Sequence, residues 1–136
     1  MAGLDEFKAL IGKQGKPTVY EVDRTMIKRY CDTLGDANPK WNDRMPPGML
    51  TCAMFMGEGI AMPPWPYPGI VDAGLELEFM KPIMVGDTIT IVNEFADAED
   101  KSSERGKRVL FSMKSIAKNQ KGEVVATSTG RVMNLG

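Results

Sequence analysis

Two kinds of hydrophobic spacing divide the chain into a helical first half and a stranded second half. Between Asp23 and Gly35, apolar residues recur three and four positions apart, as on one face of a helix: Ile27, Tyr30, Cys31 and Leu34. Asp23 is suited to cap the start of this helix, and Gly35 is suited to end it. Shorter patterns predict a helix over Asp5–Ile11 and a strand over Thr18–Val22.

A third helix is predicted from Gly48 to about Ile60, and it is apolar on nearly every side. A helix without a polar face is buried, and this one is too short to cross a bilayer, so we expect a central core helix. The segment Pro63–Pro68 (PPWPYP) follows it, with four prolines in six residues. Proline lacks a backbone N–H, so this segment is predicted to be an irregular loop.

The second half alternates apolar and polar positions, as strands do. Leu75, Leu77 and Phe79 alternate with Glu76 and Glu78. Pro82 and Gly86-Asp87 then indicate a turn, and three further strands are predicted, over Thr88–Ala98, Val109–Lys118 and Glu123–Met133. Together the elements predict an antiparallel meander that must wrap around the apolar helix to cover it. This α+β layout resembles the hotdog fold, an antiparallel β-sheet wrapped around a long central hydrophobic helix.

Composition narrows the class of protein. We expect one domain over residues 1–136. Seventeen Lys and Arg against 18 Asp and Glu argue against nucleic-acid binding, and the basic tract Lys101–Arg108 is predicted to be a solvated hairpin tip. No apolar run approaches the roughly 20 residues of a membrane span, and the N-terminus lacks a secretory signal pattern. Cys31 and Cys52 form no disulfide framework, so we expect buried thiols in a cytoplasmic protein.

The absence of histidine restricts the chemistry. A chain with no histidine cannot form a Ser-His or Cys-His nucleophile pair, and it offers no imidazole ligand to a metal. Asp, Glu, Lys, Tyr and Cys remain as acid–base candidates. We therefore predict no metal site and no cofactor.

Three motifs carry a family resemblance. An Asp-x-Asn-Pro loop begins at Asp36, Gly48-Met49-Leu50 opens the predicted central helix, and FMKPIMVGDTITI begins at Phe79. Their combination resembles the MaoC-like hydratases and dehydratases, hotdog proteins that act on enoyl and 3-hydroxyacyl thioesters. The resemblance extends from about Ile11 to Met133. It implies an acyl-CoA or acyl-carrier thioester substrate, as in fatty acid metabolism.

The resemblance also implies a set of site residues. In the family the loop reads Asp-x-Asn-Pro-x-His, and the Asp and His together activate water. Asp36, Asn38 and Pro39 match this loop, whereas Trp41 stands at the histidine position, and the connection from Trp41 to Gly48 is several residues shorter than in the family. Asp36 and Asn38 are thus the catalytic candidates. An indole N–H only donates, so the chain holds half of the acid–base pair.

The thioester and acyl sites follow from the start of the central helix. Gly48 and Met49 are the candidates for binding the thioester, because free N–H groups at a helix N-terminus stabilise a developing enolate oxygen. Trp41, Leu50 and Met54 are the candidates for the acyl pocket, since soft Met side chains suit an apolar tail.

Several interpretations stay open. The first is a supporting chain of a hetero-oligomeric hydratase, a heterodimer or heterotetramer, in which a second MaoC-like hotdog subunit supplies the histidine. The second is an active homodimer that pairs Asp36 with Tyr30, Cys31 or Glu58. A third is a non-enzymatic acyl-thioester binding module, and a thioesterase is a weaker alternative. Asp36 and Asn38 could also serve only to build a turn after the helix.

Overall fold

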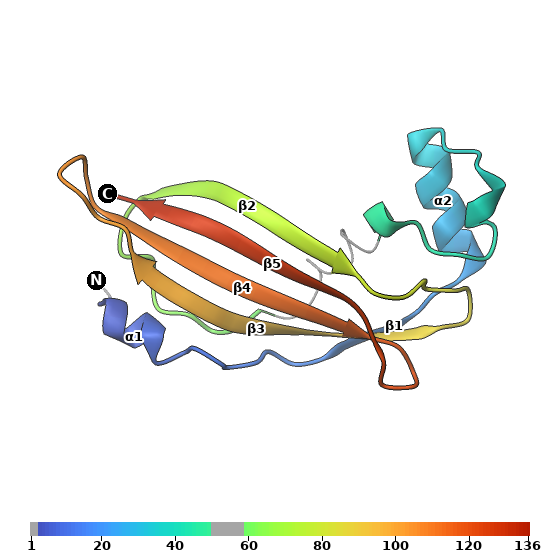
Figure 1. Cartoon of the computed structure of the whole chain (residues 1–136), viewed down its shortest axis with the longest axis horizontal. Helices are drawn as coiled ribbons and strands as arrows, with labels where there is room; N and C mark the ends of the chain where they lie inside the picture. The colour runs from blue at the N-terminus through green and yellow to red at the C-terminus, as the bar shows by residue number, and fades with distance from the viewer. Residues whose placement is uncertain (1–2, 50–58) are drawn as a thin grey trace.

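The computed structural model describes residues 3–49 and 59–136. Its helices are α1 (Leu4–Lys8), α2 (Arg24–Leu34) and the short 3₁₀ helix η1 (Pro39–Trp41). Its strands are β1 (Thr18–Glu21), β2 (Gly69–Phe79), β3 (Thr88–Asp100), β4 (Arg108–Lys118) and β5 (Val124–Leu135), as Figure 1 shows. Each of these helices and strands except η1 was predicted, with ends that differ by up to three residues, except that β2 begins at Gly69, six residues before the predicted Leu75. Beyond Met49, the predicted central helix lies outside the described residues until Gly59.

Helix α2 is closed at both ends by the predicted residues. The Asp23 carboxylate accepts a hydrogen bond from the Met26 amide at 2.7 Å, which satisfies a free N–H of the first turn. Gly35 adopts the left-handed conformation with φ of 69°. This conformation lets the next amide, that of Asp36, donate back to the Cys31 carbonyl at 2.9 Å. The chain therefore leaves α2 in a fixed direction, and Asp36 is the first residue of the loop.

The sheet has five antiparallel strands in the order β1-β3-β4-β5-β2. Strands β3, β4 and β5 form the predicted meander. The prediction that β2 continues it is wrong, because β2 pairs with β5, with Leu75 opposite Gly130. Both sides of β3 are already occupied by β1 and β4. The connection over residues 80–87 therefore crosses from the edge strand β2 to β3, which lies next to β1, the strand at the opposite edge (Figure 1).

Within the described part of the chain, buried apolar residues form two clusters on the inner face of the sheet. One lies at the α2 end and includes Ile27, Met45, Met49, Ile89 and Ile91. The other is aromatic and lies at the α1 end, where the Phe7 and Trp65 rings each meet the Phe111 ring edge-on, with centroids 4.8 and 4.9 Å apart. Such edge-to-face contacts add to the free energy gained by burial.

The proline-rich loop is irregular, as predicted, and it is tied to the sheet by one buried side chain. Asn134 accepts a hydrogen bond from the Tyr67 amide at 2.9 Å and donates to the Tyr67 carbonyl at 2.8 Å. Asn134 is fully buried, so these bonds also satisfy its polar atoms. The loop therefore delivers the chain to the start of β2 in a fixed position.

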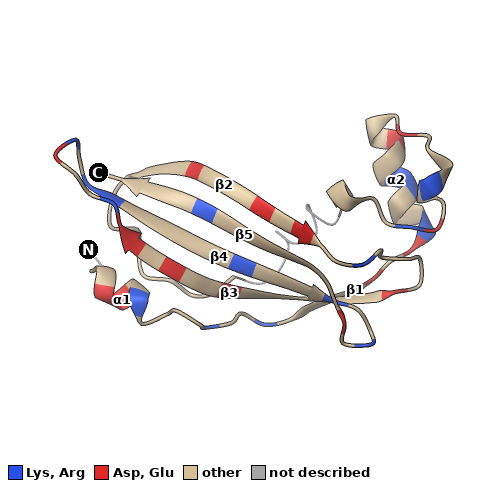
Figure 2. Ribbon diagram, viewed as in Figure 1, with Lys and Arg blue, Asp and Glu red and all other residues tan. Residues whose placement is uncertain are grey.

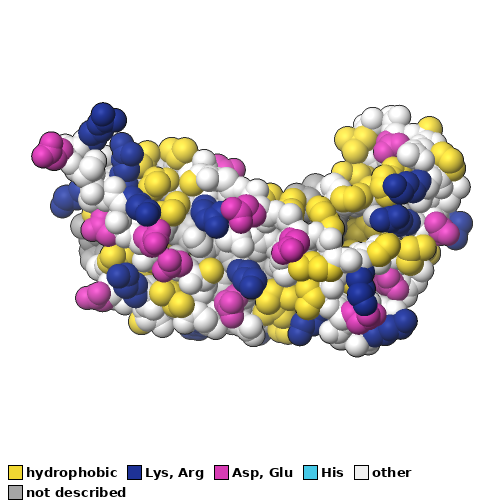
Figure 3. All heavy atoms as spheres, in the orientation of Figure 1, with side chains coloured by type: hydrophobic (Ala, Val, Ile, Leu, Met, Phe, Trp, Pro, Cys, Tyr) yellow, Lys and Arg dark blue, Asp and Glu magenta, His cyan; other side chains and the backbone are white. Residues whose placement is uncertain are grey.

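Charges of both signs are interspersed over the strands and helices (Figure 2). The space-filling view shows a notch between the end that carries α2 and the body of the sheet (Figure 3). Among residues 3–49 and 59–136, no helix is long and apolar enough to span a bilayer.

Candidate functional site

The loop after α2 is built by the residues of the Asp-x-Asn-Pro motif. The two oxygens of the Asp36 carboxylate accept different hydrogen bonds, Oδ1 from the Asn38 amide at 3.1 Å and Oδ2 from the Trp41 indole Nε1 at 2.9 Å. The Asn38 side chain accepts from the Lys40 amide at 3.1 Å and caps η1, where Pro39 takes the first position. Asp36, Asn38 and Trp41 thus form one hydrogen-bonded unit.

Trp41 is the residue that most changes what this unit can do. Its ring is half-buried against the core cluster at the α2 end, and the Lys40 ammonium lies 5.4 Å from the ring centroid. The indole N–H bonds to the carboxylate, as an imidazole N–H could, but indole has no second nitrogen to accept a proton from water. The pair Asp36–Trp41 therefore fixes the carboxylate without forming an acid–base dyad.

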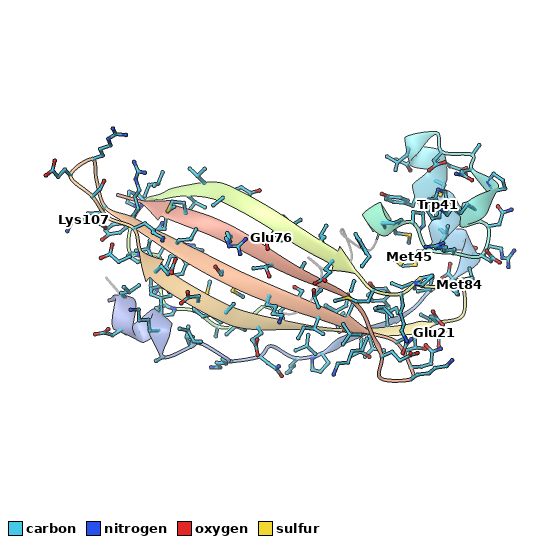
Figure 4. The ribbon with its side chains drawn as sticks, in the orientation of Figure 1. Glu21, Trp41, Met45, Glu76, Met84 and Lys107 are labelled. Carbon is cyan, nitrogen blue, oxygen red and sulfur yellow. The ribbon has the colours of Figure 1, made fainter. Side chains whose placement is uncertain are left out.

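The segment between Trp41 and Gly48 is held by the connection that crosses the sheet. The Met45 amide donates to the Ile83 carbonyl at 2.7 Å, and the Val85 amide donates to the Asp43 carbonyl at 2.9 Å. Met45 is buried beneath these bonds. In Figure 4, Trp41, Met45 and Met84 lie at the α2 end of the molecule, far from Lys107 at the opposite end. The crossing connection thus positions the short link between the motif loop and the start of the central helix.

Gly48 lies where a side chain would collide with a tyrosine. A Cβ atom at Gly48 would stand 2.4 Å from the Tyr30 hydroxyl, well inside van der Waals contact. Residues 47–49 are helical, Gly48 is exposed and Met49 is buried. A hydroxyl from α2 therefore lies beside the first helical residues, which is the place that the sequence predicted for thioester binding.

Asp36 faces a hollow of about 320 Å³ on the α2 side of the loop. Its apolar wall is formed by Ile27, Cys31 and Trp41, and two cations, Arg24 and Lys28, also line it. Gly48 is not among the described residues that line this hollow. The Asp36 carboxylate therefore borders a hollow that the described start of the helix at Gly48 does not line.

Cys31 is a poor candidate for a nucleophile. Burial raises the pKa of its thiol, and the nearby carboxylates of Asp36 and Asp32 raise that pKa further. The thiol is therefore protonated at neutral pH, and only a thiolate would attack a thioester. Its place in the core agrees with the prediction of a buried thiol.

The two cations of the hollow were not predicted from the sequence, and four of the residues named from it are ones that the structure does not describe. Arg24 and Lys28 stand four positions apart on α2, so they share a helix face beside Ile27 and Cys31. That spacing was a signal that could have identified them. Leu50 and Met54 of the predicted acyl pocket, together with Cys52 and Glu58, lie outside the described residues.

The strand order and the motif loop define a protein of the hotdog class, as the sequence predicted. The chain belongs to the family described as FAS1-like, dehydratase domain region, whose model matches residues 9–128. This finding confirms the MaoC-like hydratase and dehydratase resemblance. The matched region includes the whole motif loop from Asp36 to Trp41.

Solved structures with the same fold include MaoC-like proteins and two-chain complexes. The ChsH1-ChsH2 complex from Mycobacterium tuberculosis is similar with a TM-score of 0.75 and 21% identity, over 96% of this chain and 88% of that chain. The MaoC-like dehydratase from Rhodospirillum rubrum gives 0.70 and 21%, over 92% of each chain. The HadBC (3R-hydroxyacyl-ACP dehydratase) complex from Mycobacterium tuberculosis gives 0.70 and 14%, over 92% and 97%. At these identities the likeness establishes the fold.

Proposed function

We propose that this chain is the supporting subunit of a hetero-oligomeric hydratase or dehydratase for acyl-CoA or acyl-carrier thioesters. A second MaoC-like hotdog chain supplies the catalytic histidine. The observation that carries this proposal is the hydrogen bond from Trp41 Nε1 to Asp36 Oδ2, in a loop that otherwise keeps the family's motif.

The chemistry explains why the chain needs a partner. Hydration of an enoyl thioester requires one group to take a proton from water and another to deliver a proton to the α-carbon. In this chain each oxygen of Asp36 already accepts a hydrogen bond, and Trp41 has no basic nitrogen. A complete Asp/His pair in the second chain would perform both proton transfers, while this chain completes the fold of the assembly and contributes to the binding surface.

Strand β2 offers the surface on which the second chain would pair. It is a sheet edge of 11 residues, so no other described strand pairs with the N–H and C=O groups on its outer side. Several large apolar side chains of this strand and the residue after it are exposed: Ile70, Val71, Leu75, Phe79 and Met80. An exposed edge of this length is a template for another strand, and pairing would cover both the backbone and these side chains.

The two-chain structures with this fold support a partner of the same kind, because both the ChsH1-ChsH2 and the HadBC proteins are complexes. If the two chains pair through the same edge about a twofold axis, the β2 strands of the two subunits lie antiparallel to each other. The partner's α2 end would then lie near the β3–β4 hairpin of this chain (Figure 1). Each subunit would thereby border the loop of the other.

The test is hydration of crotonyl-CoA, a short enoyl thioester, by the purified chain alone and after reconstitution with a hotdog chain that carries Asp-x-Asn-Pro-x-His. We expect no turnover by the chain alone. Turnover in the reconstituted complex should survive Asp36→Asn in this chain and be lost when the partner's motif histidine is replaced. Turnover by the lone chain that Asp36→Asn abolishes would overturn the proposal.

A second candidate function rests on the closeness of Tyr30 to Gly48. In a homodimeric enzyme, the Tyr30 hydroxyl beside the helix start would deliver the proton that Trp41 cannot. This candidate predicts that the lone chain is active and that Tyr30→Phe removes the activity without unfolding the protein. A non-enzymatic module would instead bind the thioester and leave it unchanged, with or without the partner.

A further inference from the structure

A row of polar side chains interrupts the apolar inner face of the sheet. Asn93 on β3, Ser115 on β4 and Ser128 on β5 are register partners, so they stand side by side across three strands. The Ser115 hydroxyl donates to Asn93 Oδ1 at 2.7 Å, and Ser128 is only 7% exposed. On β3, Asn93 of this row stands between two core residues. Ile91 belongs to the cluster at the α2 end, and Phe95 belongs to the aromatic cluster.

A cavity of about 520 Å³ opens over this row. Apolar side chains form much of its wall: Ile70, Leu75, Met113 and Val132. Gly59, the first described residue after the central-helix segment, and Gly130 also line it. The cavity is therefore apolar around a hydrogen-bonding floor, which is the usual make-up of a small-molecule pocket.

Gly130 keeps the cavity open although its backbone does not require glycine. Its φ is not in the left-handed region, and an added Cβ would make only an ordinary contact of 3.8 Å with Leu75 Cδ1. A larger residue at this strand position would fill part of the space over the row. The missing side chain of Gly130 therefore leaves space in the cavity, and the glycine is not needed for a backbone turn.

We propose that the cavity binds the distal part of the acyl group, and that the row Asn93–Ser115–Ser128 hydrogen-bonds an uncharged oxygen carried there. This inference rests on the proposed acyl-thioester function and specifies its substrate class. The row starts roughly 7 Å beyond Ile91, which packs in the same cluster as Met49 at the helix start. An acyl chain that begins near Gly48 would follow the inner face of the sheet to reach it.

The charges around the cavity favour a hydroxyl or a ketone over an anion. The one described cation in the lining, Arg131, bonds to Glu76 at 3.1 Å, and Asp72 also lines the wall. A carboxylate or phosphate would thus meet no free cation among the described lining residues. The row itself offers hydroxyl and amide groups, which pair with a neutral oxygen.

The test uses two esters that carry neither a thioester nor CoA, methyl octanoate and methyl 8-hydroxyoctanoate, titrated into the full chain and followed by amide NMR. We expect shifts at Asn93, Ser115, Ser128 and Gly130 with both esters. The hydroxylated ester should bind at least as tightly as the plain one. Ser115→Ala should weaken binding of the hydroxylated ester alone, by about fivefold.

Ser112→Ala is the matched control, because Ser112 is a buried serine of the same strand that points to the opposite face of the sheet. It should change neither affinity. Gly130→Val, which fills the cavity, should abolish binding of both esters. Absence of shifts along the row, or equal weakening of both esters by Ser115→Ala, would overturn the inference. Neither result would contradict the proposed function, which the hydration assay tests separately.

Discussion

The indole nitrogen of Trp41 donates a 2.9 Å hydrogen bond to Asp36 Oδ2, and the other carboxylate oxygen accepts from the Asn38 amide. The Asp-x-Asn-Pro loop is therefore a hydrogen-bonded structure in which both oxygens of the Asp36 carboxylate have a partner. These bonds hold the shape of the loop, and the indole of Trp41 has no basic nitrogen that could accept a proton. In an assembly, that shape can support a neighbouring site without taking part in proton transfer.

The first prediction concerns this bond. Trp41→Phe keeps an aromatic ring against the core but removes the donor, so it should lower the free energy of unfolding by about 1 kcal/mol. Asp36→Asn should act through the same interaction, and the double variant should be less destabilised than the sum of the two single variants. Urea unfolding of the four proteins measures the cycle. Strictly additive effects would show that the two residues do not depend on each other.

The second prediction concerns Gly48 and Tyr30. Gly48→Ala places a methyl group 2.4 Å from the Tyr30 hydroxyl, so the phenol must move, at a cost of about 1–2 kcal/mol. With Tyr30→Phe the nearest ring atom would be 3.6 Å from the new methyl group, which is an ordinary contact. The alanine should therefore be better tolerated in the Tyr30→Phe background than in the wild type. Thermal denaturation of the single and double variants tests this, and equal penalties in both backgrounds would refute the clash.

The third prediction compares the two edges of the sheet. Val71 on β2 and Val19 on β1 are both about half exposed, with 51% and 58% of their surface accessible. Lysine at position 71 should weaken association by at least tenfold, because it brings a charge into the proposed interface. Lysine at position 19 should leave association unchanged. Sedimentation velocity over a concentration series, with the partner chain where association requires it, measures both variants.

An equal effect of the two lysine variants would argue that the β2 edge is not the interface. Circular dichroism of each variant serves as the control for folding. Val19→Lys is a suitable match because it makes the same substitution on a strand of the same sheet, and on an edge that is only four residues long.

The fourth prediction concerns Tyr20 at high pH. The Tyr20 hydroxyl is buried without a hydrogen-bond partner among the described residues, and burial raises the pKa of this phenol from 10 to about 12. The folded protein thus favours the neutral phenol. The stability that depends on the neutral phenol is fully present below pH 10. It is lost progressively as the pH rises from 10 towards 12, because the phenol of the unfolded chain ionises at a lower pH than that of the folded protein.

Tyr20→Phe should therefore be more stable than the wild type at pH 8, by about 1 kcal/mol, because it removes an unsatisfied buried hydroxyl. Its advantage should grow between pH 10 and pH 12. Chemical unfolding at pH 8, 10 and 11 measures the difference. An advantage that stays constant across this range would mean that the phenol ionises as easily in the folded protein as in the unfolded chain.

Local patterns predicted most of the elements because the causes of those elements are local. The Asp23 cap and the Gly35 terminus of α2 depend on side chains and backbone within one helical turn, and both could be inferred from residue type. The turn at Asn119–Gly122 and the irregular Pro63–Pro68 loop follow from the same kind of local chemistry.

Strand pairing and the site contacts could not be inferred in this way. Alternation marks Leu75, Leu77 and Phe79 as a strand, but it says nothing about which strand they pair with, and β2 pairs with β5. The bond between Trp41 and Asp36 depends on a 3₁₀ turn at Pro39 that orients the indole towards the carboxylate. The polar row across β3, β4 and β5 depends on register, which no single strand reveals.

The strand order also has a consequence for synthesis of the protein. Tyr67, just before β2, is held by Asn134, which lies 67 positions later in the sequence and close to the end of β5. On the ribosome, β2 therefore emerges long before β5 and has no strand to join until β5 has been made. Its apolar residues are exposed throughout that interval, when unpaired strand edges are most prone to aggregate. The final strand thus completes the sheet, and the edge that we propose for the partner forms in the last step of folding.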